Sequence, residues 1–445
     1  MTRKNLAGTK SELSRRAVLG AGAASALALP IAADAMPRPM PETWDETVDV
    51  VVVGSGFAGL AAAYEAQKAG ASVAILEKMR TPGGNSLISG GVMSAAGSPA
   101  QAAQGIEDSP EQLYQDMLTA GLHLNHPELA RIAAERSTET HQWTVDEFGA
   151  EWADELSHMG GHAVPRAYKT AVGSGAGVVV PMLETLRDLG IEPRTGALLK
   201  HIVRDDDGRV KGVEIREGYR FPDEDSGTTK LIRASRGVVL ATGGFGNDIG
   251  FRMLQDPRLD ETLDSTNQPG ATGEALREDN KVIAFCDGKG FEVAQQRLGD
   301  DLLAALLDSG VVRKFDTLDA MAAAYDSPLD PLAETISAFN GSVDVGEDQE
   351  MGRYMQADQF RIETPPYYAV RLLPKIHHCM GGLAMDAEAR ALDVQTSDPI
   401  PGLYVAGEAA GGVHGASRLG SCAYVDCLVF GRIAGKNVAV HPAWG

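Results

Sequence analysis

The sequence predicts an α/β fold that opens with a strand, a glycine-rich turn and a helix. Residues 48–53 are valines with a single interruption, and such an apolar run without alternation is typical of a strand buried on both faces. Glycines punctuate residues 54–59, and the alanine-rich residues 60–70 favour a helix. Residues 71–76 predict the next strand, which is followed by Glu77. This order within about 30 residues indicates a Rossmann-like dinucleotide-binding unit.

The residues of the glycine-rich turn have separate expected roles. Gly54 permits the tight turn, Gly56 lets the backbone approach a pyrophosphate, and Gly59 lets the helix pack closely on the strand. Phe57 and Ala58 begin the helix, whose unpaired N–H groups and dipole favour an anion. The turn is therefore a candidate pyrophosphate site, and a glycine-rich turn without a ligand is the alternative.

Glu77 stands where the ribose of a dinucleotide is expected. Its carboxylate would accept hydrogen bonds from the ribose diol and repel a 2'-phosphate, which argues against NADP. Lys78 follows directly and is a further candidate contact of the cofactor.

Glycine clusters later in the sequence are further candidate contacts of the same cofactor. Residues 84–86 and 90–91 suit a loop that flanks a flat ring, because consecutive glycines let the backbone pass close to it. Residues 242–244 and 407–408 each follow a predicted strand, and residues 421–438 predict a closing helix. The dinucleotide-binding domain is therefore expected to be discontinuous in sequence.

Other elements can be placed from pattern alone. Residues 198–215 predict a β-hairpin whose turn lies at residues 205–208. The segment between the two parts of the nucleotide domain looks mainly helical, with amphipathic candidates at residues 314–325 and 330–340.

Length and composition indicate a soluble protein of two domains. The chain has 445 residues, of which 44% are hydrophobic and 23% charged. Residues 1–35 combine basic residues, the pair Arg15-Arg16, a short apolar run and a small-residue cleavage site, which predicts a twin-arginine signal peptide. A chance arginine pair in a frayed tail is the alternative. The prediction implies a periplasmic bacterial protein that is exported in the folded state.

The negative charge narrows the range of partners. The formal net charge is -21, and it becomes -24 without residues 1–35, which carry five basic and two acidic residues. Such a chain repels nucleic acid, whereas it would attract a basic redox partner such as a c-type cytochrome. Solubility alone is the alternative explanation.

The cysteines indicate no metal or haem site. Cys286, Cys379, Cys422 and Cys427 show neither a C-x-x-C nor a C-x-x-C-H spacing. The sequence also contains no transmembrane segment after the predicted signal peptide. Any haem that serves this protein is therefore expected on a separate chain.

Eight motifs in order carry a family resemblance. They lie at residues 51–56, 84–86, 160–166, 241–245, 265–270, 376–382, 402–408 and 414–420. With them the chain resembles the flavoprotein part of the soluble fumarate reductases of the flavocytochrome c type and the related urocanate reductases.

The resemblance implies non-covalent FAD and hydride transfer between flavin N5 and the double bond of a small unsaturated carboxylate. Arg418 matches the arginine that clamps the substrate carboxylate, and the pair His377-His378 matches the histidine position that contacts it. The candidate FAD-binding residues are Gly54, Gly56, Phe57, Ala58, Gly59, Glu77, Lys78, Gly84, Asn85, Ser86, Gly90, Gly91, Thr242, Gly243, Gly244, Gly407, Glu408, Arg418, Ser421 and Ala423.

The chain departs from the family pattern in the middle. The expected division is an FAD-binding domain at residues 45–273 and 363–442 with a shortened cap at residues 274–362. The family's proton donor is an arginine in the cap, and Arg277 is the candidate for it here. An ordinary surface arginine is the alternative, since a short loop does not by itself place Arg277 over the flavin.

The sequence leaves two other candidate proton donors and two other interpretations of the protein as alternatives. Without the cap arginine, His162 or Tyr168 could supply the proton that reduction of an alkene requires. A chain that has lost the catalytic cap could instead be an FAD-bearing electron-transfer or binding subunit. A deletion that leaves a poorly folding chain is the third possibility.

Overall fold

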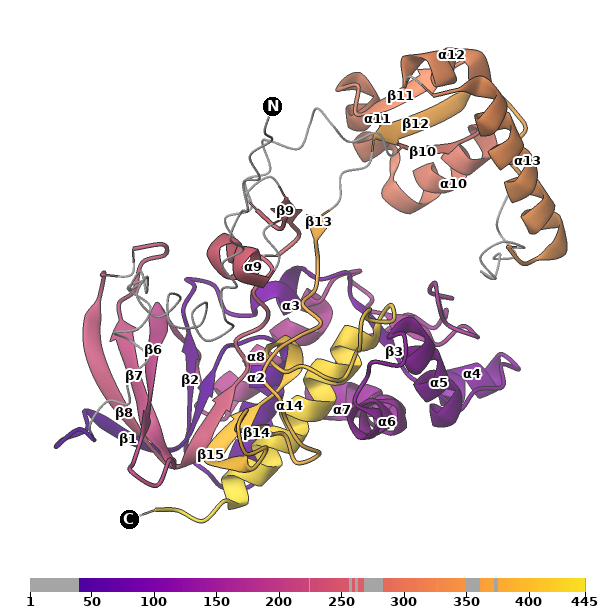
Figure 1. The fold of residues 1–445 in the computed structure, drawn as a ribbon. Coiled ribbons are helices and arrows are strands. Elements are labelled where there is room, and N and C mark those ends of the chain that lie inside the picture. Colours follow the sequence, from indigo (N-terminus) through magenta and orange to yellow (C-terminus); the bar gives the residue numbers. More distant parts are fainter. Residues whose placement is uncertain are drawn as a thin grey trace, which may run out of the picture.

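A mixed β-sheet forms the centre of the molecule and carries the predicted Rossmann-like unit (Figure 1). The computed structural model describes residues 40–223, 225–255, 258–260, 263–267, 283–325, 327–348, 361–371 and 375–444. The strand order is β14-β15-β8-β1-β2-β5, and β7 and β6 continue from β8. The strands are β1 (Glu46–Val53), β2 (Val73–Glu77), β5 (Arg194–Thr195), β6 (Ala197–Arg204), β7 (Val210–Glu217), β8 (Thr228–Leu240), β14 (Arg390–Leu392) and β15 (Pro399–Val405).

The strands that end at the cofactor side run parallel. β1 pairs in parallel with both β2 and β8, and β15 pairs in parallel with β8. Val50, Val51 and Val52 of β1 have no exposed surface, as predicted for a strand covered on both faces. The carboxyl ends of these strands therefore lie together, which is where open α/β sheets bind their ligands.

Two helices pack against each other beside this sheet. They are α2 (Phe57–Lys68), which follows β1, and α14 (Cys422–Val440), which closes the chain. A Cβ at Gly431 of α14 would lie 2.5 Å from the carbonyl oxygen of Ala58, and one at Gly435 would lie 2.3 Å from that of Ala62. Glycine at both positions therefore lets the two helix backbones approach closely.

A helical layer extends from the other side of α14 (Figure 1). Prolines at the first turn and serine N-caps at Ser98 and Ser109 define the starts of two of its helices. This layer contains β3 (Val92–Ser94), α4 (Pro99–Ala103), α5 (Pro110–Ala120), α6 (Pro127–Glu135) and α7 (Ser137–Phe148), and β4 (Ala167–Lys169) pairs with β3. In contrast, α8 (Ala176–Asp188) packs against α2 and against α3 (Gly84–Ile88).

The cap has its own small core and stands apart from the sheet in Figure 1. Phe315, Met321, Leu332 and Ala369 are among its buried residues. Its elements are β10 (Ile283–Cys286), α10 (Gly288–Leu298), α11 (Asp300–Asp308), β11 (Val312–Phe315), α12 (Leu318–Ala324), α13 (Leu329–Val345) and β12 (Tyr367–Arg371). The chain reaches the cap through α9 (Ile249–Gln255) and the paired strands β9 (Asp264–Ser265) and β13 (Lys375–Ile376).

The structure agrees with most of the predicted elements and corrects one. The hairpin of β6 and β7, the helix α13 and the closing helix α14 lie where the sequence predicts them. Residues 312–315 form strand β11, so the helix predicted from residue 314 is wrong over its first residues. The three-stranded sheet β10-β12-β11 was not predicted, because β12 lies about 50 residues from β11 in sequence and no local pattern reports that pairing.

Two kinds of feature are absent from the described residues. None of the described helices has the length and apolar composition that a membrane crossing requires. The described part of the chain also contains no cluster of three or more His, Cys, Asp or Glu side chains that could ligate a metal ion.

Candidate active site

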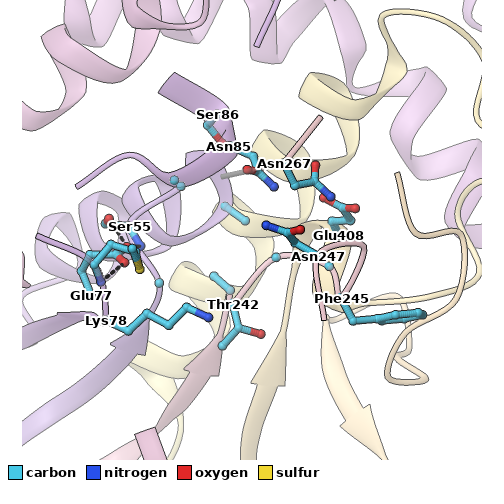
Figure 2. A pocket seen from close by; sticks show the side chains of 18 of the residues that line it. Ser55, Glu77, Lys78, Asn85, Ser86, Thr242, Phe245, Asn247, Asn267 and Glu408 are labelled. Atoms are coloured by element: carbon cyan, nitrogen blue, oxygen red, sulfur yellow. Dashed lines mark hydrogen bonds between the residues drawn. The ribbon is translucent and has the colours of Figure 1, made fainter. Parts of the chain in front are cut away.

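A pocket of about 780 Å³ opens at the carboxyl ends of β1, β2 and β8 (Figure 2). Many of the residues that line it come from the predicted glycine clusters. They are Gly54, Ser55, Gly56, Phe57, Ala58, Glu77, Lys78, Met79, Gly84, Asn85, Ser86, Leu198, Tyr219, Phe221, Pro222, Ala241, Thr242, Gly243, Gly244, Phe245, Asn247, Asp248, Ile249, Asn267, Ala406, Glu408 and Cys427.

Close backbone packing explains why two of the turn residues are glycines. Gly54 has φ +106°, and a Cβ there would lie 2.1 Å from the carbonyl oxygen of Ala241. A Cβ at Gly59 would lie 2.0 Å from the carbonyl oxygen of Gly54. No other residue fits these positions without moving the backbone, so the turn between β1 and α2 has a narrowly defined shape.

The amino terminus of α2 faces the pocket and can receive an anion. Its N-cap is Gly56, which has no side chain to occupy the free N–H groups. The hydroxyl of Ser86 accepts the N–H of Phe57 at 3.0 Å and lies at the same edge of the pocket. The bare turn and the positive end of the helix dipole suit the pyrophosphate of a dinucleotide.

Glu77 is buried and held in place at the end of β2. Its carboxylate accepts the hydroxyl of Ser55 at 2.5 Å and the N–H of Met79 at 2.8 Å. The hydroxyl of Ser55 in turn accepts the N–H of Gly83 at 2.9 Å. These bonds fix a carboxylate at the pocket wall, where it can accept hydrogen bonds from a ribose.

A second group of polar side chains lies beyond Glu408 and does not line the pocket. His378 is 8% exposed, with its Nδ1 3.7 Å from Oε1 of Glu408 and its ring 5.4 Å from that of His414. His414 in turn lies against Asp426, with 3.2 Å between Nε2 and Oδ2. His377 is more exposed and meets the hydroxyl of Thr266 through Nδ1 at 2.6 Å.

Two buried nitrogen atoms in this second group have no hydrogen-bond partner among the described residues. They are Nε of Arg418 and Nε2 of His378. Within the described residues, Arg418 makes one hydrogen bond, from Nη1 to the carbonyl oxygen of Leu419 at 3.0 Å. Buried donors without partners are unfavourable, so both nitrogens are candidates for contact with a bound ligand.

Burial and neighbouring positive charge shift the titration of these groups. Burial lowers the pKa of His378 to about 2, with further lowering by His414, Arg418 and His377. Burial and then Arg418 also lower the pKa of His377. Burial raises the pKa of Glu408. The two imidazoles are therefore neutral at pH 7 and can each donate one N–H to an anion.

The remaining candidates lie around the pocket or outside the described residues. Seven predicted FAD contacts do not line the pocket: Gly59, Gly90, Gly91, Gly407, Arg418, Ser421 and Ala423. Gly59 and Gly407 pack against the backbone or side chains of the turn and α2, while the N–H of Gly91 binds the hydroxyl of Tyr424 at 3.0 Å. Ser421 is the N-cap of α14 and Ala423 lies in its first turn. Arg277 lies outside the described residues.

The alternative proton donors have structural partners. His162 is 4% exposed, and burial lowers its pKa to about 4. Tyr168 is also buried, and its hydroxyl donates to Ser98 at 2.9 Å. Neither residue lines the pocket.

Several pocket residues were not among the predicted contacts. Asn247 and Asn267 line the pocket and are labelled close to Glu408 in Figure 2, and Nδ2 of Asn267 is buried without a partner. Tyr219 and Phe221, which follow β7, form another part of the wall. Asn267 belongs to the motif at residues 265–270, so that motif was the available signal. The residues after β7 carried no comparable one.

Comparison with known proteins identifies the family of the chain. The family model described as an FAD binding domain matches residues 49–295 and 305–423. An acrylate reductase flavoprotein subunit of Shewanella woodyi is 36% identical, and the match covers 98% of this chain and 99% of that protein.

The chain belongs to this family of FAD-binding reductase flavoproteins. FAD is its cofactor, and it is an FAD-dependent oxidoreductase of the fumarate reductase type. A urocanate reductase of Eggerthella lenta is 30% identical over 90% of this chain and 75% of that protein. The open conformation of a flavocytochrome c3 fumarate reductase is 30% identical, with a TM-score of 0.65 over 98% of this chain and 83% of that one.

The flavoprotein relatives contain residues that this chain lacks. The match to the acrylate reductase subunit extends over 507 residues, whereas this chain has 445. The excess must consist of stretches present only in the relative.

Proposed function

We propose that this flavoprotein reduces the carbon–carbon double bond of a small unsaturated carboxylate, an enoate, and that Arg418 and His378 hold the carboxylate. The observation that carries the proposal is the pair of buried, unpartnered nitrogens on these two side chains. A carboxylate can accept from both, which would satisfy two donors that the folded chain leaves without partners.

In this proposal the cofactor and the carboxylate-binding residues have separate roles. Bound FAD would supply a hydride to the double bond. The planar guanidinium of Arg418 would orient the carboxylate, and the positive charge there would polarise the alkene for attack at its far carbon. The neutral imidazole of His378 would donate a second hydrogen bond to the same group.

The proton for the other alkene carbon needs a separate donor. Arg277, outside the described residues, is our candidate, and a surface role is the alternative. His162 and Tyr168 are less suitable, because both are buried against structural partners. The proton donor must lie on the side of the substrate opposite the flavin.

Acrylate-type monocarboxylates are among the substrates that we expect. This expectation follows from the similarity to the flavoprotein subunit of an acrylate reductase from Shewanella woodyi.

The proposal also names the electron donor of the flavin and the cellular location of the protein. The chain has no C-x-x-C-H motif, so we propose that a separate redox protein, such as a c-type cytochrome, reduces the flavin. The signal-like residues 1–35 support export to the periplasm by the twin-arginine route.

A flavin-bearing electron-transfer subunit is the second candidate. The observation that favours it is the set of residues present in the acrylate reductase subunit and absent here. Such a subunit would bind FAD and exchange electrons without reducing enoates.

Steady-state turnover with reduced viologen separates the two candidates. We expect wild-type holoprotein to reduce at least one of acrylate, methacrylate, crotonate, urocanate and fumarate. Arg418→Ala should lower kcat/KM by about a hundredfold or more, because the carboxylate loses a charged, bidentate partner. The matched control is Arg187→Ala on the exposed surface of α8, which should leave turnover unchanged. Wild-type protein that binds FAD but reduces none of the five would support the second candidate.

A further inference from the structure

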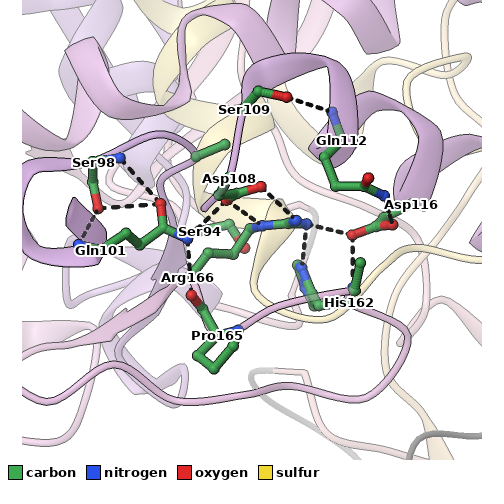
Figure 3. A network of polar contacts seen from close by, with 12 residues as sticks. Ser94, Ser98, Gln101, Asp108, Ser109, Gln112, Asp116, His162, Pro165 and Arg166 are labelled. Atoms are coloured by element: carbon green, nitrogen blue, oxygen red, sulfur yellow. Dashed lines mark hydrogen bonds and ion pairs between the residues drawn. The ribbon is translucent and has the colours of Figure 1, made fainter. Parts of the chain in front are cut away.

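A fully buried arginine lies at the centre of an ion network beside α14 (Figure 3). Arg166 forms two hydrogen bonds to Asp108, from Nε and Nη2, each of 2.9 Å. Its Nη1 donates to Asp116 at 2.5 Å and meets Nδ1 of His162 at 3.0 Å. We call Asp108, Asp116, His162 and Arg166 the Arg166 cluster. All of its charged groups are paired, so the cluster is rigid.

Arg166 determines which nitrogen of His162 carries the proton. A guanidinium can only donate, so Nδ1 of His162 must be the acceptor in their contact. The proton of the neutral ring is then on Nε2, which lies 2.8 Å from the carbonyl oxygen of Gly420 and donates to it. Burial, which lowers the pKa of His162 to about 4, keeps the ring neutral at pH 7. One tautomer of one imidazole therefore links the Arg166 cluster to Gly420.

Gly420 belongs to a short turn that presents Arg418. We call residues 418–421 the Arg418 turn. Ser421 has φ +60°, which is unusual for a residue with a side chain, and it is the N-cap of α14. Its hydroxyl donates to the carbonyl oxygen of Gly420 at 2.5 Å and lies 2.6 Å from the hydroxyl of Ser94.

The contacts show what holds this turn in its unusual conformation. The carbonyl oxygen of Gly420 accepts from His162 on one side and from Ser421 on the other. Within the described part of the chain, the hydrogen bond of Arg418 stays inside the turn and goes to the carbonyl oxygen of Leu419. The direction of the Arg418 side chain therefore depends on the position of this backbone, and His162 is its contact with the rigid cluster.

We propose that His162, held in a single tautomer by Arg166, is a positioning residue that sets the Arg418 turn and thereby the carboxylate-binding guanidinium. The proposal rests on the proposed function, since it concerns the same carboxylate site. His162 does not touch the substrate or exchange a proton with it. It acts through the carbonyl oxygen of Gly420.

Two substitutions of His162 separate positioning from simple core packing. His162→Gln places an amide N–H near the position of Nε2 and can still donate to Gly420. His162→Leu fills a similar volume and cannot donate. The matched control is His141→Leu in α7, because His141 is also buried, at 8% exposure, and contacts Trp152 and Tyr168 rather than the Arg418 turn.

The experiment measures ligand binding as well as turnover in FAD-loaded protein. Propionate is titrated into the oxidised protein and its Kd is read from the change in the visible flavin spectrum, and KM and kcat are then measured with acrylate. We expect His162→Leu to raise both Kd and KM on the order of ten- to hundredfold with full FAD content, as for other residues that orient a binding group. His162→Gln should restore both to within about threefold of wild type, and His141→Leu should change neither, although both leucine variants melt at lower temperature.

Each result decides a different point. If wild type binds propionate and His162→Leu binds it equally well, or if His141→Leu weakens binding to the same extent, the positioning role is wrong and the proposed function stands. If wild type neither binds propionate nor reduces acrylate or the other enoates, the proposed function fails, and the positioning role fails with it.

Discussion

The candidate active site has two ends that differ in how their polar groups are satisfied: the cofactor end near Glu77 and the proposed carboxylate end near Arg418. At the cofactor end, a Cβ on Gly54 or Gly59 would lie within 2.1 Å of a backbone oxygen, and Glu77 already holds bonds to Ser55 and Met79. At the carboxylate end, buried nitrogens of Arg418 and His378 lack partners among the described residues. The cofactor end is therefore shaped by the fold itself, whereas the proposed carboxylate end has buried nitrogens that a bound ligand would satisfy.

This contrast predicts that substitutions at the cofactor end act on folding and FAD content. Substitutions at the carboxylate end should act on ligand affinity and leave the holoprotein intact. The tests below are arranged from the largest expected effect to the smallest.

The largest effect is expected at Gly54. Gly54→Ala introduces a Cβ 2.1 Å from the carbonyl oxygen of Ala241 at φ +106°, so the turn must move. We expect a loss of about 2–5 kcal/mol in the free energy of unfolding and loss of bound FAD. Thermal melting and the ratio of flavin to protein absorbance measure both. Gly70→Ala is the matched control, because its φ is +86° but nothing lies within 4 Å of the added Cβ. A Gly54→Ala protein with normal FAD content would contradict the account of the cofactor end.

Acid should destabilise the protein through the buried imidazoles. The pKa of His162 is lowered to about 4 and that of His378 to about 2, both chiefly by burial. The unfolded chain binds protons near pH 6.5 that these folded imidazoles do not bind, so stability is full above pH 7 and falls as the pH falls from 6.5 to 4. Each group should contribute up to about 1.4 kcal/mol per pH unit.

Melting curves of FAD-loaded protein between pH 4 and 8 measure this dependence. His378→Gln removes one of these imidazoles, so stability should fall less steeply with decreasing pH, by up to about 1.4 kcal/mol per pH unit. An unchanged slope in this variant would show that His378 is not held in the neutral state by burial.

A smaller effect, on affinity alone, is expected at the histidine pair. His378→Leu removes the buried nitrogen that we propose binds the carboxylate, so KM for acrylate should rise on the order of tenfold or more with normal FAD content. His377→Leu should raise KM by about threefold or less, because His377 is more exposed and already bonded to Thr266. Steady-state kinetics with reduced viologen compare the two. Equal effects of the two substitutions on KM would contradict the assignment of His378, rather than His377, as the main histidine contact of the carboxylate.

The strand, turn and helix of the Rossmann-like unit could be predicted from the sequence because they depend on local backbone rules. A strand, three glycines, a helix and an acidic residue in order are sufficient to specify the turn that meets a pyrophosphate. The pocket indeed contains Gly54, Gly56, Glu77 and the later residue Glu408.

Features that depend on pairing of distant residues were not predicted. The sheet of the cap joins β11 to β12 across α12 and α13, and His162 reaches Gly420 across 258 residues. Motifs at residues 160–166 and 414–420 were recognised separately, but nothing in a single sequence shows that they meet. The same reason explains why Tyr219 and Phe221 were missed as walls of the pocket.

Reoxidation of the reduced flavin by single enoates tests the central claim most directly. FAD-loaded protein is reduced without oxygen, mixed with acrylate or fumarate, and followed by its visible absorbance in wild type and Arg418→Ala. We predict rapid reoxidation of the wild type by acrylate, at least as fast as by fumarate, and slower reoxidation of Arg418→Ala by about a hundredfold at subsaturating enoate. A wild-type flavin that stays reduced with both, or an Arg418→Ala protein as fast as wild type, would contradict the account.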